Sequence, residues 1–517
     1  ESFIMKMTLP LCMIALLLGF LPVNISARAV TLYVSPDGKD IWSGALNSPS
    51  PDGTDGPLAT MLGARDAIRE MKATPLKEPV TVVIADGVYE LDEPLAFTSE
   101  DSGTAACPIT YMAAADASPI ISGGRGITGW AKGEGELWKV RVPEVSEGNW
   151  YFHQLFVNGR RAIRARTPNV GYLRMEGPIK PLANRDEARR DPSTKVGFRF
   201  VPGDIVHWPN LDEVNVFVYH SWTSSLHWIK EIDDQENIIR FLGSSGWPIG
   251  WWENTARYHI ENYREALDAP GEWYLEPNTG ICYYWPLEGE DMSTAHVVAP
   301  KLGLLLRADW DKASESCVEH ITFKGLSFQH ADWLLEKTAV NDGQGAAFQQ
   351  DATVMLTGAR HISFEQCEIA HTGTYALWFR EGSKENKVIQ CHLHDLGTGG
   401  IRIGEKATPE NDMCAVEHIL VDNSWIHDGG HVFPAGHGVW IGRASYNTIS
   451  HCDISDFFYT GIAIGWSWGY AESTAHHNVV EYCHIHNLGK GVLSDMGTIY
   501  TLGLAPGTRL TNNVMHD

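Results

Sequence analysis

ISHCDISD, at residues 449–456, decides the fold together with GIAIG at residues 461–465. In both segments apolar and polar side chains alternate, which is the pattern of a short strand with one buried face. The first pattern recurs in the last third of the chain, at residues 321–330, 362–371, 389–395, 479–487 and 510–517. The second recurs at residues 400–404 and 438–442 and, more loosely, at 497–503. Because successive copies lie roughly 24 to 41 residues apart, the range of stacked solenoid coils, the sequence predicts an all-β chain folded as a parallel β-helix.

Stacking of the coils places equivalent positions of successive repeats above one another, about 4.8 Å apart. One column of small residues is expected to point inward, namely Cys367, Cys391, Ser424, Cys452, Cys483 and Asn513. Two positions along the repeat an apolar column follows: Ile369, Leu393, Ile426, Ile454, Ile485 and Met515. Four positions along comes a polar column: His330, His371, Asp395, Asp428, Asp456, Asn487 and Asp517. The simplest interpretation of the polar column is turn chemistry, because Asp, Asn and His tolerate tight turns and bond nearby backbone N–H groups.

The composition favours an uncharged polymer as the partner. The formal net charge is −24, spread along the chain, and this charge would repel nucleic acid and anionic membrane surfaces. The chain also holds 19 Trp and 17 Tyr residues, whose flat aromatic faces can bind sugar rings. We therefore expect a carbohydrate substrate and no nucleic-acid partner, while the oligomeric state is left open.

The start of the chain is typical of a secretory signal. Residues 1–29 contain a basic start at Lys6, an apolar stretch from Leu9 to Val23 and a small-residue end. No later segment reaches the roughly 18 apolar residues that a membrane span needs. We expect an exported protein, secreted or periplasmic, without a membrane anchor. The ladder cysteines are interpreted as buried packing residues, and the absence of Cys-x-x-Cys and His-Glu-x-x-His patterns predicts no metal and no cofactor.

The remaining chain divides into three parts. The predicted boundaries are residues 30–128 for an N-terminal cap and the first coils, 129–299 for an inserted antiparallel β module, and 300–517 for the continuing β-helix. The cap includes a short helix that begins after Thr60. The inserted module contains a hairpin signal at Asn158-Gly159. Because the chain stops part-way round a coil, we expect further coils beyond Asp517.

Five tryptophans of the inserted module leave two interpretations open. They either overhang the β-helix as part of a binding wall or only pack the module onto it. These residues are Trp222, Trp228, Trp247, Trp251 and Trp252.

The polar turns of a β-helix line a lateral groove, where carboxylates of adjacent coils can face each other. Glycoside hydrolysis needs two such carboxylates, about 5 to 5.5 Å apart for retention of configuration and about 6.5 to 9.5 Å apart for inversion. Asp495 lies outside the polar column, so the repeat itself does not require it. We predict that Asp495 is catalytic, with Asp456 as its partner one coil earlier.

Further candidates lie near the same groove. His437 either hydrogen-bonds a sugar hydroxyl or is a satisfied turn histidine, and the aromatic residues either stack on sugar rings or belong to the core. The predicted substrate-binding residues are Asp428, His437, Trp440, Trp466, Trp468, Glu472 and Tyr500.

Four runs carry a resemblance to known proteins: AIRARTPN at residues 162–169, GEWYL at 271–275, GIAIGW at 461–466 and SDMG to LG at 494–503. They resemble exported bacterial right-handed parallel β-helix glycosidases of glycoside hydrolase family 141, with α-L-fucosidase and xylanase activities. The β-xylosidases of family 120 are more distantly similar. The resemblance implies a right-handed β-helix and matches Asp495 to one catalytic carboxylate. It also implies a partner acid about one coil further on, beyond Asp517.

The leading hypothesis is therefore a secreted glycoside hydrolase that cleaves a plant-type polysaccharide or oligosaccharide by a two-carboxylate mechanism. Adjacent-coil spacing favours retention of configuration. One rival is a polysaccharide lyase on the same scaffold, but it needs a basic groove or clustered Asp around Ca²⁺, and only Arg402, Arg443 and Lys490 are near. The other rival is a non-catalytic adhesin or glycan-binding β-helix, which needs aromatic residues without paired acids.

Overall fold

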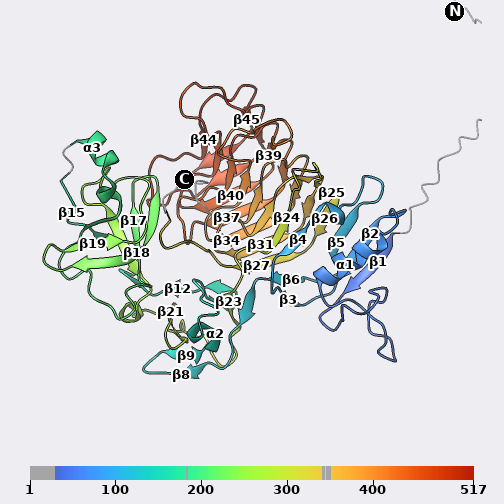
Figure 1. The fold of residues 1–517 in the computed structure, drawn as a ribbon, viewed down its shortest axis with the longest axis horizontal. Helices are drawn as coiled ribbons and strands as arrows, with labels where there is room; N and C mark the ends of the chain where they lie inside the picture. The colour runs from blue at the N-terminus through green and yellow to red at the C-terminus, as the bar shows by residue number, and fades with distance from the viewer. Residues whose placement is uncertain (1–28, 182–183, 340–343, 345–350) are drawn as a thin grey trace, which may run out of the picture.

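The computed structural model describes residues 29–181, 184–339, 344 and 351–517. Three long parallel sheets dominate the described residues, and each coil contributes one strand to each sheet. The all-β parallel β-helix predicted from the sequence is therefore confirmed, with three strands per coil where the sequence motifs indicated at least two. Figure 1 shows the coils stacked from the blue N-terminal end to the red C-terminal end, with the inserted module in green and teal alongside.

The strands of the three sheets follow in spatial order. The first sheet contains β1 (Val30–Val34), β2 (Val80–Ile84), β5 (Ile109–Ala113), β26 (Ile321–Lys324), β30 (Ser363–Glu365), β33 (Lys387–Ile389), β36 (Leu420–Asp422), β39 (Thr448–Ser450), β42 (Val479–Glu481) and β45 (Arg509–Thr511). The second sheet contains β3 (Val88–Glu90), β6 (Ile120–Ser122), β27 (Ser327–Ala331), β31 (Glu368–Thr372), β34 (His392–Leu396), β37 (Trp425–Gly429), β40 (Asp453–Phe457), β43 (His484–His486) and β46 (Val514–His516). The third sheet contains β4 (Leu95–Phe97), β24 (Leu306–Ala308), β28 (Val354–Leu356), β32 (Leu377–Phe379), β35 (Ile401–Ile403), β38 (Val439–Ile441), β41 (Ile462–Ile464) and β44 (Ile499–Thr501).

The two predicted ladders form the core of the coils. In the second sheet the apolar column runs in register through Ile426, Ile454 and Ile485, each fully buried. The small-residue column is buried from Cys367 to Cys483, and the described cysteines, among them Cys452 and Cys483, are free thiols. The prediction of packing cysteines rather than disulfides is confirmed for these residues. The last members of the two columns differ, because Asn513 is partly exposed and Met515 is exposed.

The polar column forms a corner of every coil. Its members from His330 to Asp517 all have positive φ, for example 48° at Asp395, 56° at Asp428 and 54° at Asn487. Asn, Asp and His are the non-glycine residues that enter this left-handed region at the least cost. From β27 onward, the repeated polar residue therefore lies within one residue of the end of its second-sheet strand, where the chain turns toward the third sheet.

The inserted module consists of antiparallel sheets beside the coils. One sheet contains β11 (Arg160–Arg161), β10 (Phe156–Val157), β23 (Val297–Pro300) and β7 (Gly124–Gly126). A second contains β12 (Ile163–Arg164), β21 (Glu272–Glu276), β22 (Ile281–Tyr284), β9 (Trp138–Arg141) and β8 (Ala131–Lys132), with β12 and β21 parallel. The largest contains β13 (Arg166–Thr167), β20 (Arg257–Glu261), β17 (Asn215–Tyr219), β18 (Ser224–Asp233), β19 (Ile238–Phe241), β16 (Gly197–Arg199) and β15 (Gly177–Pro178), with β14 (Leu173–Arg174) beside β20.

Two local predictions are confirmed, the helix in the N-terminal cap and the hairpin in the inserted module. Helix α1 (Met61–Met71) begins after Thr60, whose side chain accepts a hydrogen bond from the Gly63 backbone N–H. The hairpin of β10 and β11 turns at Asn158 and Gly159, both with positive φ, as a type I′ turn requires.

Shorter elements complete the described chain. They are α2 (Pro143–Ser146), α3 (Arg185–Arg190), the pair β25 (Val318–Glu319) and β29 (Ala359–Arg360), and three single 3₁₀ turns. None of the helices in the described residues is long and apolar enough to span a bilayer. Residues 1–28, which hold nearly all of the predicted signal, lie outside the described residues, so export stays a prediction.

Candidate active site

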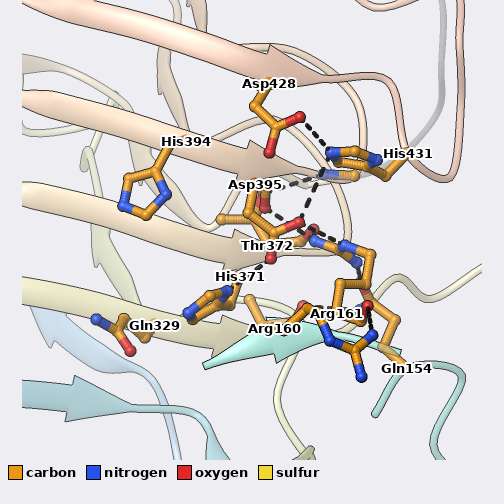
Figure 2. Close-up of polar contacts among 12 residues, drawn as sticks. Gln154, Arg160, Arg161, Gln329, His371, Thr372, His394, Asp395, Asp428 and His431 are labelled. Carbon is orange, nitrogen blue, oxygen red and sulfur yellow. Dashed lines mark hydrogen bonds and ion pairs between the residues drawn. The ribbon is translucent and has the colours of Figure 1, made fainter. Parts of the chain in front are cut away.

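The inserted module is fastened to the coils by an arginine at the end of β11. The Arg161 Nε donates to Asp395 Oδ1 over 2.7 Å, and its Nη2 donates to the backbone oxygens of Thr372 (2.9 Å) and Asp395 (2.8 Å), as Figure 2 shows. The Nη1 donates to the side-chain oxygen of Gln154. One side chain of the module therefore bonds two consecutive coils.

Asp395 is fixed as an anion by this contact. Its side chain is 12% exposed, and His371 Nδ1 lies 2.6 Å from its second carboxylate oxygen. Burial by itself would raise the pKa of Asp395, but the Arg161 guanidinium, His371 and His431 outweigh it and hold that pKa well below its usual value. A carboxylate so fully paired anchors the module and is unsuited to attack a sugar or to exchange a proton.

The larger of two cavities lies between the module and the corner of the second sheet, and its volume is about 780 Å³. Asp428 lines it from the coils, and His431 Nε2 lies 3.0 Å from Asp428 Oδ1 (Figure 2). The hydrogen bond from His431 is the main cause that lowers the pKa of Asp428. The module contributes Glu261, paired with His259 at 2.8 Å, to the opposite wall. The cavity is thus polar, but its acids are engaged with His side chains.

The second cavity holds the residue predicted to be catalytic. Its volume is about 470 Å³, and its described lining includes one carboxylate, Asp495. The other walls are largely aromatic. Trp222, Trp247 and Trp252 come from the module, and Trp466, Trp468 and Tyr500 come from the coils. The structure thereby brings Asp495, Trp466, Trp468 and Tyr500 together as predicted, and it places three of the five module tryptophans opposite them.

The segment that carries Asp495 is positioned from both sides. On the module side, Ser221 accepts the Ser494 backbone N–H at 2.8 Å, and the two hydroxyls lie 2.6 Å apart. On the coil side, the Tyr459 hydroxyl donates to the Asp495 carbonyl oxygen at 2.7 Å. These contacts hold Asp495 in a left-handed conformation with φ 54°, so that its exposed side chain borders the cavity.

Tyr500 is the polar neighbour of the Asp495 carboxylate among the described residues. Its hydroxyl lies 3.5 Å from Asp495 Oδ1. Partial burial and the negative charge of Asp495 raise the pKa of Tyr500. The phenol therefore keeps its proton at neutral pH and can donate it in a hydrogen bond to the carboxylate.

Two predicted substrate-binding residues are buried, and those predictions are wrong. Trp440 is fully buried against Ala463 and Trp466, so no sugar ring can stack on it. His437 is 3% exposed, and burial lowers its pKa to about 3. Of the two interpretations, His437 fits the turn histidine, because its ring Nδ1 lies 3.5 Å from the buried Tyr375 hydroxyl, which also accepts the His437 backbone N–H at 3.1 Å.

Two further predicted residues line neither of these cavities. Asp456 accepts a hydrogen bond from Lys490 Nζ at 2.9 Å, so the structure does not bring it together with Asp495 in one cavity. Glu472 is exposed to solvent. Asp428, by contrast, lies in the larger cavity. The sequence analysis missed Arg161 and Glu261, since no local pattern distinguishes a module residue that faces the coils. It also missed His431, which lies in the loop between β37 and β38, outside the repeated motifs.

Comparisons with known proteins agree with this architecture. The family model described as "Right handed beta helix region" matches residues 350–516, and the model described as "GH141 insertion domain" matches residues 135–287. No curated protein sequence matches the chain.

A solved structure has the same fold, and two others are more distantly similar. A structure titled "Glycoside hydrolase" has a TM-score of 0.79 at 24% sequence identity, covering 95% of this chain and 88% of that one. A complex of XylC with xylose has a TM-score of 0.48 at 13% identity, covering 94% and 66% of the two chains. A GH136 lacto-N-biosidase from Eubacterium ramulus has a TM-score of 0.42 at 11% identity, covering 94% and 56%. The resemblance stated from the sequence is confirmed: the chain combines a right-handed parallel β-helix with a segment that matches the GH141 insertion domain.

Proposed function

We propose that this protein is an exported glycoside hydrolase that acts on a plant-type polysaccharide or oligosaccharide at the cavity around Asp495. The observation that carries the proposal is an exposed carboxylate, free of salt bridges within the described residues, at the edge of a cavity walled by aromatic side chains. Tryptophan and tyrosine faces suit the apolar faces of sugar rings, while a carboxylate can attack the sugar carbon or protonate the leaving oxygen.

The module and the coils divide the work at this site. Trp222 and Trp252 of the module face Trp466 and Trp468 of the coils, so a sugar chain bound there would lie between two aromatic walls. Tyr500 would donate a hydrogen bond to Asp495 and hold it in one rotamer. Such fixed positions favour reaction because the entropy of orientation is already lost before the sugar binds.

A glycosidase of this kind needs a second carboxylate. We propose that an adjacent coil supplies it, because adjacent coils place side chains at about the 5 to 5.5 Å separation of retaining enzymes. In this mechanism Asp495 acts either as nucleophile or as general acid, and the anomeric configuration is retained.

We propose that the larger cavity continues the same groove along the coils. Val492 lines the larger cavity, and Asp495, three residues later, lines the smaller one. We propose that the larger cavity accommodates further sugar residues of the chain. The resemblance to family 141 makes α-L-fucosides, xylosides and xylan the first substrates to test.

One basic residue that a polysaccharide lyase was expected to use does not lie in the groove. Arg402, one of three basic residues expected near the groove, is 2% exposed and lies against Trp378, 3.5 Å from the ring centroid. It is therefore not available to neutralise a uronate carboxylate in the groove.

The decisive experiment is Asp495→Asn in the full-length protein, assayed with a panel of aryl glycosides and xylan oligosaccharides. Loss of a catalytic carboxylate should lower kcat by about 10²-fold or more. Asp456→Asn is the matched control, since Asp456 pairs with Lys490, and it should keep wild-type turnover. Circular dichroism checks that both variants fold.

Three outcomes would contradict the proposal. Wild-type turnover by the Asp495→Asn variant would remove Asp495 from the mechanism. A rise in absorbance from unsaturated products would indicate a lyase. Glycan binding that persists without product after every groove carboxylate is replaced would indicate an adhesin. NMR of the first-formed anomer then tests retention.

A further inference from the structure

The outward face of the second sheet carries a cluster of histidines and a carboxylate from three consecutive coils. Glu368 on β31 is the register partner of His392 on β34, and His394 lies two residues after His392 on the same face. His427 on β37 belongs to the next coil and lies two residues after Trp425, the register partner of His392. Alternation along a strand places His392 and His394 on the same side.

The same arrangement recurs three coils later. Asp453 on β40 is the register partner of His484 on β43, and His486 lies two residues further on that strand. His486 is in turn the register partner of His516 on β46. Both clusters therefore consist of a carboxylate, a His-x-His strand in the next coil and one histidine in the coil after it.

The ligand atoms of each cluster converge. In the first cluster, His394 Nε2 lies 2.9 Å from Glu368 Oε1, and His392 Nε2 lies 2.8 Å from His427 Nε2. The ligand atoms of Glu368, His392 and His394 all lie within 4.8 Å of one another.

In the second cluster, His484 Nδ1 lies 2.9 Å from one carboxylate oxygen of Asp453, and His486 Nε2 lies 3.2 Å from the other. The Nε2 atoms of His484 and His516 are 2.9 Å apart. Two ligands bound to one tetrahedral ion at about 2.0 to 2.1 Å would lie about 3.3 Å apart. The His–carboxylate separations of 2.9 to 3.2 Å in the two clusters are close to that value.

We propose that these two clusters are binding sites for divalent transition metal ions of the Zn²⁺ type. Imidazole and carboxylate together suit Zn²⁺ and its neighbours, whereas Ca²⁺ and Mg²⁺ take oxygen ligands. A hydrogen-bonded His–carboxylate pair explains one contact in each cluster. It does not explain why, in both clusters, a histidine of the following coil directs a ring nitrogen at the first histidine of the His-x-His strand.

An ion held by the converging residues of either cluster, Glu368, His392 and His394 or Asp453, His484 and His486, would join two consecutive coils of the β-helix across the second sheet. The first site also borders the larger cavity, because His394 is among the residues that line it. The second site lines neither cavity, so its role is to stabilise the coils. The inference depends on the fold and not on the proposed enzymatic activity.

The test is calorimetric titration of the chelator-treated full chain with Zn²⁺ alone, together with metal analysis after dialysis. The wild type should bind two ions per chain. His394→Ala and His486→Ala should each lose one ion, and the double variant should lose both.

His451→Ala is the matched control. His451 contacts a single carboxylate, Asp422, at 2.8 Å, outside both clusters, so this variant should keep both ions. Zn²⁺ should also raise the Tm of the wild type and of the control but not that of the double variant, because binding to the folded state alone stabilises it. No saturable binding, or equal binding by the wild type and the double variant, would overturn the proposal.

Discussion

Replacing Arg161 by Met tests how the inserted module is held on the β-helix. The methionine keeps much of the volume of the arginine stem but removes the guanidinium that bonds Asp395 and the Thr372 carbonyl. Asp395 would then be a buried carboxylate with His371 as its remaining close partner. Removing one member of a buried ion pair costs about 3–5 kcal/mol, because the other charge stays desolvated. We expect Arg161→Met to lower the free energy of unfolding by that amount at pH 7.

The cost should depend on pH with a definite sign. In the folded wild type the pKa of Asp395 lies below its unfolded value of about 3.9, so its stabilisation is present above that pH and is lost as the pH falls through the folded value. In the variant burial is no longer outweighed by Arg161, and the pKa of Asp395 rises. The variant therefore loses less stability on acidification, and the difference between the two proteins should shrink below about pH 4.

Urea unfolding followed by tryptophan fluorescence at pH 7 and at pH 3.5 measures both quantities. Asp395→Asn and the double variant complete a thermodynamic cycle, and the double variant should be no less stable than Arg161→Met alone. A loss below about 1 kcal/mol, well short of the 3–5 kcal/mol of a buried pair, would refute the reasoning. An equal loss at both pH values would refute it as well.

Two other predictions concern the coils and the cavity. Asn487 lies at a corner of the coil with φ 54°. Asn487→Val should therefore lower the free energy of unfolding by about 1–2 kcal/mol, while Asn487→Gly should be nearly neutral. Equal changes in Tm for the two variants would contradict the argument from backbone strain. Trp468, 62% exposed at the cavity, and Trp440, fully buried, should behave oppositely. Trp468→Ala should weaken oligosaccharide binding by about 1 kcal/mol with an unchanged Tm, whereas Trp440→Ala should cost about 3–5 kcal/mol of stability. Binding calorimetry measures the first effect and thermal unfolding the second. A stable Trp440→Ala variant would show that the site is not packed as described.

The architecture of the coils was predictable because its causes are local and repeated. Each strand alternates apolar and polar residues, so Ile454 and its equivalents could be assigned to the core without knowing the coil above or below. The corner residues could be assigned for the same reason, since Asp, Asn and His are the non-glycine residues that enter the left-handed region readily. The buried column of small residues that includes Cys452 could be predicted from the register of the repeats alone.

The candidate site was predictable only in part. Asp495 attracted attention because the repeat does not require an acid there, and Trp466, Trp468 and Tyr500 lie close to it along the coils. Trp440 was misassigned because alternation puts it on the outward face of the third sheet, but Trp466 then covers that face. Whether an outward side chain meets solvent depends on the loops that cross it, and periodicity does not describe them.

The sequence by itself determined that this chain stacks into a parallel β-helix and which side chains point inward, because strand alternation and corner conformations depend on near neighbours. Only the tertiary structure decided which outward residues meet. Arg161 joins Asp395 across 234 positions of sequence, and Ser221 meets Ser494 across 273. Such pairs form because the inserted module folds back onto one side of the coils, and no period in the sequence records that contact.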